Sequence, residues 1–138
     1  VGNGEHAAPG EPLNDVFRRY RKNIDIANSK RRKEVIFYEK EMSSDWLTMH
    51  YSWKEEYDFI YIDGSHTAKD CLTDCILAWP LLKSGGIMVI DDYIWAGSVG
   101  NPALSPKYGI DVFTTLWSEE MEWVGAGVQV VVRKRDVR

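Results

Sequence analysis

The sequence predicts an α/β domain with parallel strands in the middle of its sheet. Two short runs, residues 57–63 (YDFIYID) and 87–91 (IMVID), show the continuous apolar pattern of strands covered on both faces. Between them, residues 67–82 carry apolar side chains at helical spacing. Strands that alternate with helices are typical of parallel pairing. The length of 138 residues favours a single domain over 1–138.

Further elements are expected before this unit. Residues 13–28 predict a helix, because apolar side chains recur there at spacings of three and four. Residues 34–40 (EVIFYEK) predict a short strand. Ser43, Ser44 or Asp45 is expected to cap a short helix that runs to about residue 51.

After the central unit, the glycines in residues 83–86 (KSGG) are expected to end the helix before the second strand. Residues 93–105 form a long loop, and long ordered loops are often functional. A helix over 110–117 follows, and residues 121–124 and 128–133 predict a terminal hairpin.

Composition excludes several classes of function. Lysine and arginine total 17 against 21 aspartates and glutamates, so the net charge of −4 disfavours a general nucleic-acid binder or a polybasic membrane anchor. No apolar run approaches the roughly 20 residues of a membrane span, and none resembles a signal peptide. Cys71 and Cys75 lie four apart in one predicted helix, which suits buried, reduced thiols. We therefore expect a cytoplasmic protein.

Acidic residues follow both central strands. Asp63 ends the first strand, and Asp91 and Asp92 end the second. The carboxyl ends of parallel strands share one edge of a sheet, where ligands of open α/β folds bind. Close carboxylates repel unless a cation or protons intervene, and Mg²⁺ prefers such oxygen ligands. The alternative is that these acids cap helices or form turns.

His66 lies three residues after Asp63, at the start of the predicted helix. A histidine beside a cation site is a candidate general base, because its pKa lies near neutrality. A surface or packing role is the alternative. The sequence contains no G-x-S-x-G, phosphate-binding P-loop or G-x-G-x-x-G motif.

Residues 57–95 resemble the class I S-adenosylmethionine-dependent methyltransferases, in the branch of small-molecule and sugar O-methyltransferases. The resemblance rests on I-D-G-S-H after one strand, L-L-K-S-G-G before the next and D-D-Y after it. Residues 17–24 (FRRYRKNI), 41–47 (EMSSDWL) and 127–134 (GVQVVVRK) are similar to other parts of that branch.

The resemblance implies a fold and a reaction. The fold would be a truncated Rossmann-like methyltransferase sheet, mostly parallel, with a C-terminal antiparallel hairpin; the full family sheet has seven strands and helices on both faces. The reaction would be methyl transfer from S-adenosylmethionine to a small-molecule hydroxyl, assisted by Mg²⁺. The positions that match the family assign metal ligation to Asp63, Asp91 and Asp92, catalysis to His66 as base together with Asp63, adenine binding to Ser43, and a substrate lid to Tyr93, Trp95 and residues 96–108.

The family's first strand, glycine-rich cofactor loop and second strand are expected before residue 1. Those strands are central in the family's sheet, so we expect residues 34–40 to pair directly with 57–63 or another subunit to fill the gap. A homo-oligomer, such as a dimer, is the expected assembly. The alternative function is a non-catalytic remnant or fragment that binds a ligand, metal or partner.

Overall fold

The computed structural model describes residues 13–30, 39–95 and 100–136. The chain divides into two compact units, Val1–Lys40 and Glu41–Arg138. In the first unit, helix α1 (Leu13–Ser29) forms as predicted. Most of the strand predicted over 34–40 lies outside the described residues, so its pairing stays a prediction.

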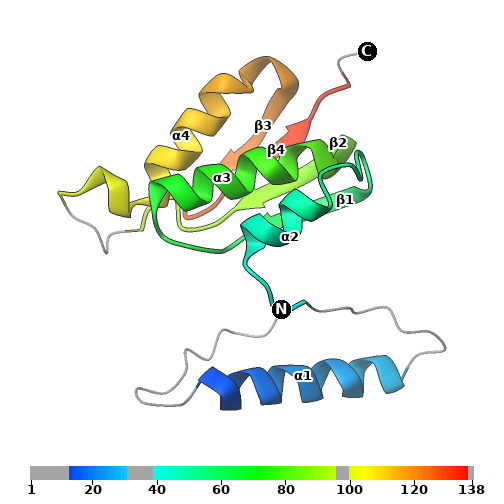
Figure 1. The fold of residues 1–138 in the computed structure, drawn as a ribbon. Helices are drawn as coiled ribbons and strands as arrows, with labels where there is room; N and C mark the ends of the chain where they lie inside the picture. Colours follow the sequence, from blue (N-terminus) through cyan, green and yellow to red (C-terminus); the bar gives the residue numbers. More distant parts are fainter. Residues whose placement is uncertain (1–12, 31–38, 96–99, 137–138) are drawn as a thin grey trace. The chain divides into compact units, whose positions relative to one another are not determined.

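The second unit contains a four-stranded mixed sheet in the order β1-β2-β4-β3 (Figure 1). Strand β1 pairs in parallel with β2, whereas β4 pairs antiparallel with both β2 and β3. This arrangement confirms an α/β fold with a C-terminal antiparallel hairpin. The strands span Tyr57–Ile62 (β1), Leu82–Ile90 (β2), Met121–Ala126 (β3) and Val130–Lys134 (β4).

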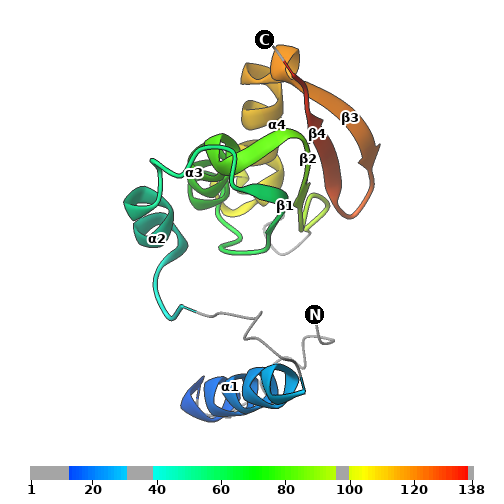
Figure 2. The same ribbon diagram turned by 90° about the vertical axis from the view of Figure 1, so that its right-hand side faces the viewer.

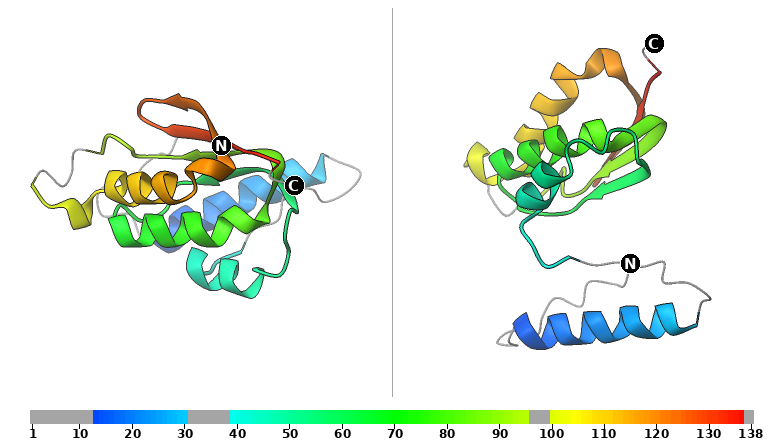
Figure 3. Two further views of the ribbon diagram at one scale, coloured as in Figure 1. Left: turned by 90° about the horizontal axis from the view of Figure 1, so that it is seen from above. Right: turned by 45° about the vertical axis from the view of Figure 1, so that its right-hand side comes forward.

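Helices α3 (Ala68–Ala78) and α4 (Pro106–Leu116) lie side by side over one face of the sheet (Figures 2 and 3). The short helix α2 (Ser43–Met49) packs beside α3. Gly109 lets α3 and α4 approach closely, because a Cβ there would lie 2.3 Å from the carbonyl oxygen of Ala68. Short 3₁₀ turns at Trp79–Leu81, Pro102–Leu104 and Ser118–Glu120 complete the unit.

The core lies between this face of the sheet and the two helices. It combines alternate strand residues with the inner stripe of each helix, and the Trp79 and Phe113 rings meet edge to face at 5.5 Å. Its buried members are Cys71, Cys75, Ala78, Trp79, Leu82, Met88, Ile90, Ile110, Phe113, Met121, Val130 and Val132. Both cysteines are free and buried, as expected.

The prediction that β1 is covered on both faces is wrong for the described residues. Phe59 is 58% exposed and Tyr61 is 37% exposed, whereas Ile60 and Ile62 pack against the core. Within Glu41–Arg138, helices α3 and α4 pack on one face of the sheet, and alternate side chains of β1 point to the other face.

The predicted end of the central helix is also wrong. Helix α3 begins after Thr67, whose side chain caps it, and ends at Ala78. Pro80 lacks a backbone N–H, and a 3₁₀ turn takes over at that point. The glycines at 85 and 86 belong to β2 rather than to a helix-ending turn, and Gly85 takes the left-handed φ of 81° within that strand.

The expected cap of α2 is corrected as well. Its N-cap is Met42, which makes no side-chain cap bond, and the helix ends at Met49 rather than near residue 51. Helix α4 starts at Pro106, earlier than predicted, because proline fits the first turn of a helix. Strand β3 ends at Ala126, two residues later than predicted, and β4 begins at Val130, two residues later than predicted. Among the described residues, every helix is too short or too polar to cross a membrane.

Candidate active site

The acidic residues that follow β1 and β2 meet at one edge of the sheet. Asp63, Asp91 and Asp92 all line one small cavity of about 10 Å³, together with Asp74 of α3. The parallel pairing explains this, since Ile62 pairs with Ile90 and the next residue of each strand is acidic. The cavity holds about one water-sized group.

Asp91 is held by three hydrogen bonds. Its Oδ2 accepts from the hydroxyl of Tyr61 and from Nε2 of Gln129 at 3.1 Å, and its Oδ1 accepts from the backbone N–H of Asp92 at 2.8 Å. Burial raises the pKa of Asp91, but these hydrogen bonds outweigh burial and leave that pKa below its usual value. Asp91 is therefore a fixed carboxylate anion at neutral pH.

Tyr61 responds in the opposite direction. Its hydrogen bond to Asp91, then burial and the negative charges of Asp91, Asp63 and Asp92, raise the pKa of Tyr61 to about 12. The phenol thus stays protonated and keeps donating to Asp91. Gln129 Nε2 also donates to the Tyr61 hydroxyl at 3.1 Å, which closes a network of three side chains.

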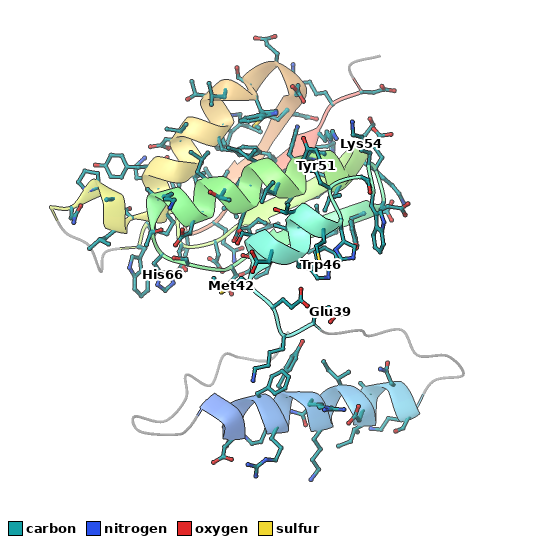
Figure 4. All side chains as sticks on the ribbon, viewed as in Figure 1. Glu39, Met42, Trp46, Tyr51, Lys54 and His66 are labelled. Atoms are coloured by element: carbon teal, nitrogen blue, oxygen red, sulfur yellow. The ribbon has the colours of Figure 1, made fainter. Side chains whose placement is uncertain are left out.

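His66 forms a close pair with Asp92. Its Nε2 lies 2.9 Å from Asp92 Oδ2, and its ring stacks on Trp95 with centroids 4.1 Å apart. Asp92 holds the left-handed φ of 60°, which non-glycine residues seldom adopt. His66 lies just before α3, away from Tyr51 and Lys54 beyond the other end of that helix (Figure 4). The imidazole of His66 is thus oriented by the carboxylate of Asp92 at Nε2 and by the indole face of Trp95.

Asp63 is the least engaged of the three carboxylates. Among the described residues it has no hydrogen-bond or ion-pair partner. Burial, followed by the charges of Asp91 and Asp92, raises the pKa of Asp63, and the nearby His66 lowers it only in part. The edge therefore carries negative charge that its own side chains do not balance.

Tyr93 is anchored to α4 rather than left mobile. Its hydroxyl donates to Asp111 Oδ1 at 2.8 Å and accepts from Lys107 Nζ at 2.8 Å. Lys107 also donates to Asp111 Oδ2 at 2.7 Å, and the hydrogen bonds to Asp111 and Tyr93 raise the pKa of Lys107. The start of the predicted lid is thus tied to a helix. Residues 96–99 of that lid lie outside the described residues.

Among the described residues, Ser43 is linked to the acidic edge through its hydrogen bonds to Asp74. Its Oγ donates to both carboxylate oxygens of Asp74, at 2.8 and 2.9 Å, and so ties α2 to α3. Burial raises the pKa of Asp74, and the Ser43 hydrogen bond opposes that rise only in part. The structure therefore places Ser43 beside Asp74, and its assignment to adenine binding stays a prediction.

The donors at this edge match the chemistry of a hard cation. Among residues 13–30, 39–95 and 100–136, no three His, Cys, Asp or Glu side chains are arranged to hold a metal ion together. Magnesium seldom needs such a cage, because it usually keeps several waters and takes one or two carboxylates. An unpartnered Asp63 beside two further carboxylates fits that mode of binding.

Sequence reasoning did not identify Tyr61 and Gln129. Gln129 lies in the turn of the hairpin, and the register pairs Ile90 with Val130, which places Gln129 next to Asp91 across the strands. Only the antiparallel register between β2 and β4 carries this information. The apolar neighbours of Tyr61 predict a buried strand there and give no sign of a site residue.

Comparisons with known proteins identify the family of the chain. Residues 6–93 match the family described as Methyltransferase domain. The chain belongs to this methyltransferase domain family. A search of curated proteins found no match.

Two kinds of solved structure are similar to the chain. A protein from Corynebacterium glutamicum superposes with a TM-score of 0.63 at 18% identity, over 90% of this chain and 58% of that one. The MycE methyltransferase of the mycinamycin biosynthetic pathway, in complex with Mg, SAH and mycinamycin VI, superposes with a TM-score of 0.51 at 18% identity. The match covers 72% of this chain and 31% of that one. At this identity the likeness establishes the fold. The chain spans little more than half of the first protein and under a third of the second.

Proposed function

We propose that the chain takes part in methyl transfer from S-adenosylmethionine to the hydroxyl of a small molecule, with Mg²⁺ at the acidic edge. Membership of the methyltransferase domain family supports the cofactor. The observation that carries the rest is His66, paired with Asp92 at 2.9 Å beside the unpartnered carboxylate of Asp63. A candidate base and candidate cation ligands therefore lie together. This supports deprotonation of a substrate hydroxyl at the acidic edge.

The acidic edge would supply both the cation ligands and the base. One or two of the carboxylates Asp63, Asp91 and Asp92 would bind the cation directly and the rest through its waters, with Asp91 already oriented by its hydrogen bonds. A bound Mg²⁺ lowers the pKa of a coordinated hydroxyl. Asp92 holds the Nε2 proton of His66, which leaves the Nδ1 lone pair to accept the proton of the substrate hydroxyl. S-adenosylmethionine, when bound, would supply the methyl group, which would pass from the sulfonium sulfur to the deprotonated oxygen and leave S-adenosylhomocysteine.

Two further residues shape the surroundings of His66. Trp95 stacks on the imidazole and would keep its plane fixed while a substrate binds. Tyr93, anchored to Lys107 and Asp111, fixes the backbone between Asp92 and Trp95. Both residues support a substrate-facing role for this segment. Ser43 would contact the adenine, a role that requires its hydroxyl to leave or share Asp74.

Calorimetric titration of the chain with S-adenosylhomocysteine, with and without Mg²⁺, tests the proposal. We expect saturable binding, followed by transfer of labelled methyl groups from S-adenosylmethionine to members of a panel of small hydroxyl compounds. A His66→Gln variant should bind the product cofactor equally well and transfer label about 10²- to 10⁴-fold more slowly. Absence of both binding and transfer would favour the alternative, a non-catalytic binding protein.

A further inference from the structure

The turn of the C-terminal hairpin contributes a side chain to the acidic edge. Gln129 lies between β3 and β4, and its Nε2 donates to Asp91 Oδ2 and to the Tyr61 hydroxyl, both at 3.1 Å. The same turn is bound to the site a second time, because the backbone N–H of Tyr93 donates to the carbonyl of Val128 at 2.8 Å. The turn is therefore part of the structure that fixes residues 91–93.

The hydrogen bonds occupy most of the lone-pair directions of the Asp91 carboxylate. An ionised carboxylate has about four lone-pair directions. Tyr61 and Gln129 use those of Oδ2, and the backbone N–H of Asp92 uses one of Oδ1. Among the residues that the structure describes, no other group uses the remaining direction, on Oδ1, so that about one is left for a further ligand. Without Gln129 or Tyr61 the carboxylate could turn and offer its oxygens elsewhere.

We propose that Gln129, together with Tyr61, is a positioning residue that orients Asp91 toward a divalent cation through Oδ1. The inference rests on the proposed function, since it concerns the same cation. Groups that hydrogen-bond to a ligating carboxylate typically change metal affinity by about 10- to 100-fold when they are removed. Gln129 itself never touches the cation.

Replacement of Gln129 offers a clean test because its side chain is exposed and lies in a turn. Gln129→Leu removes both donated hydrogen bonds at nearly constant size. Tyr61→Phe removes the other bond to Asp91. Val128→Ala is the matched control, since it changes the neighbouring exposed side chain and keeps the backbone carbonyl that binds Tyr93. Thermal unfolding of each variant shows whether it remains folded.

The probe is MgCl₂, and binding is followed by calorimetry and by the intrinsic tryptophan fluorescence of the chain, to which Trp95, stacked on His66, contributes. We expect Gln129→Leu and Tyr61→Phe each to weaken Mg²⁺ binding by about 10- to 100-fold, and Val128→Ala to leave it unchanged. In an Asp91→Asn background, Gln129→Leu should have no further effect, because Gln129 acts through that carboxylate. A merely structural role would weaken binding in both backgrounds.

The possible failures are distinguishable. If the wild-type chain binds Mg²⁺ and Gln129→Leu binds it equally well, the positioning role is overturned while the cation site stands. If Gln129→Leu weakens binding equally with and without Asp91, the route through Asp91 is overturned. If the wild-type chain shows no saturable Mg²⁺ binding, the cation site of the proposed function is overturned, and this inference with it.

Discussion

The imidazole of His66 and the carboxylate of Asp92 lie 2.9 Å apart, and Asp92 holds the left-handed φ of 60° at this contact. Surrounding bonds maintain that conformation. The backbone N–H of Asp92 donates to Asp91 Oδ1 at 2.8 Å, and the N–H of Trp95 donates to the carbonyl of Asp92 at 3.0 Å. An unusual backbone conformation that is held in this way is typical of functional sites.

Asp92→Asn should weaken Mg²⁺ binding by at least about 10-fold without unfolding the domain. Asparagine tolerates a positive φ better than most residues, so the turn should survive while the charge is lost. Calorimetric titration with MgCl₂ and a thermal unfolding curve check both parts. An unchanged Mg²⁺ affinity would indicate that Asp92 only forms the turn.

His66→Gln should lower the rate of methyl transfer by about 10²- to 10⁴-fold, the usual contribution of a general base. The affinity for S-adenosylhomocysteine should stay the same. His50→Gln is the control, because that ring stacks on Trp46 at 4.0 Å and is not among the residues at the acidic edge. Equal loss of rate in both variants would refute the assignment of the base.

Tyr61 should make the fold sensitive to alkaline pH. Its pKa is raised to about 12 in the folded chain, above the ordinary tyrosine value of 10.0. Between these values the unfolded chain loses the phenolic proton first, so the free energy of unfolding contributed by Tyr61 falls as pH rises from 10 toward 12. Denaturant unfolding across this window should show a steeper decline in the wild type than in Tyr61→Phe. Parallel curves would contradict the bond to Asp91.

Asp74 should make the free energy of unfolding depend on pH in the acidic to neutral range. Burial raises the pKa of Asp74, so its stabilising contribution is complete below the pKa of the unfolded chain and is lost as pH rises through the folded pKa. Asp74→Asn keeps an oxygen that can accept from Ser43 and has no charge to bury. We expect this variant to gain stability over the wild type from pH 4 to pH 7, as measured by urea unfolding. A constant difference would show that Asp74 does not titrate in this range.

Gly109→Ala should destabilise the domain by about 1–3 kcal/mol, the usual cost of overpacking. The new methyl group would lie 2.3 Å from the carbonyl oxygen of Ala68 and would force α3 and α4 apart. Gly125→Ala is the matched control, because nothing lies within 4 Å of the Cβ position at Gly125. Equal stability of the two variants would refute the close packing of these helices.

Local patterns were sufficient to predict the middle of the fold. The helical spacing in α3 and the apolar runs of β1 and β2 depend on neighbouring residues. Asp63, Asp91 and Asp92 follow directly from these runs once β1 and β2 are taken as parallel neighbours. The exposure of Phe59 could not be predicted in this way. It depends on which elements cover the second face of the sheet, and a single strand does not carry that information.

The errors in the prediction have similar causes. The two glycines after α3 predict the end of a helix. In the structure, the helix ends before Pro80, and β2 begins at Leu82. Gln129 was missed because its contact with Asp91 spans 38 residues and depends on the register of β4 against β2. Tertiary pairing, rather than local propensity, decides such contacts.

The most direct test of the account is a calorimetric titration of MgCl₂ into the wild-type chain and into a variant that combines Asp63→Asn, Asp91→Asn and Asp92→Asn. Three amides keep the size of the side chains and remove the charge from the edge. We predict saturable binding by the wild type and none by the variant. No saturable binding by the wild type, or equal binding by both proteins, would contradict a cation-assisted site at the ends of β1 and β2.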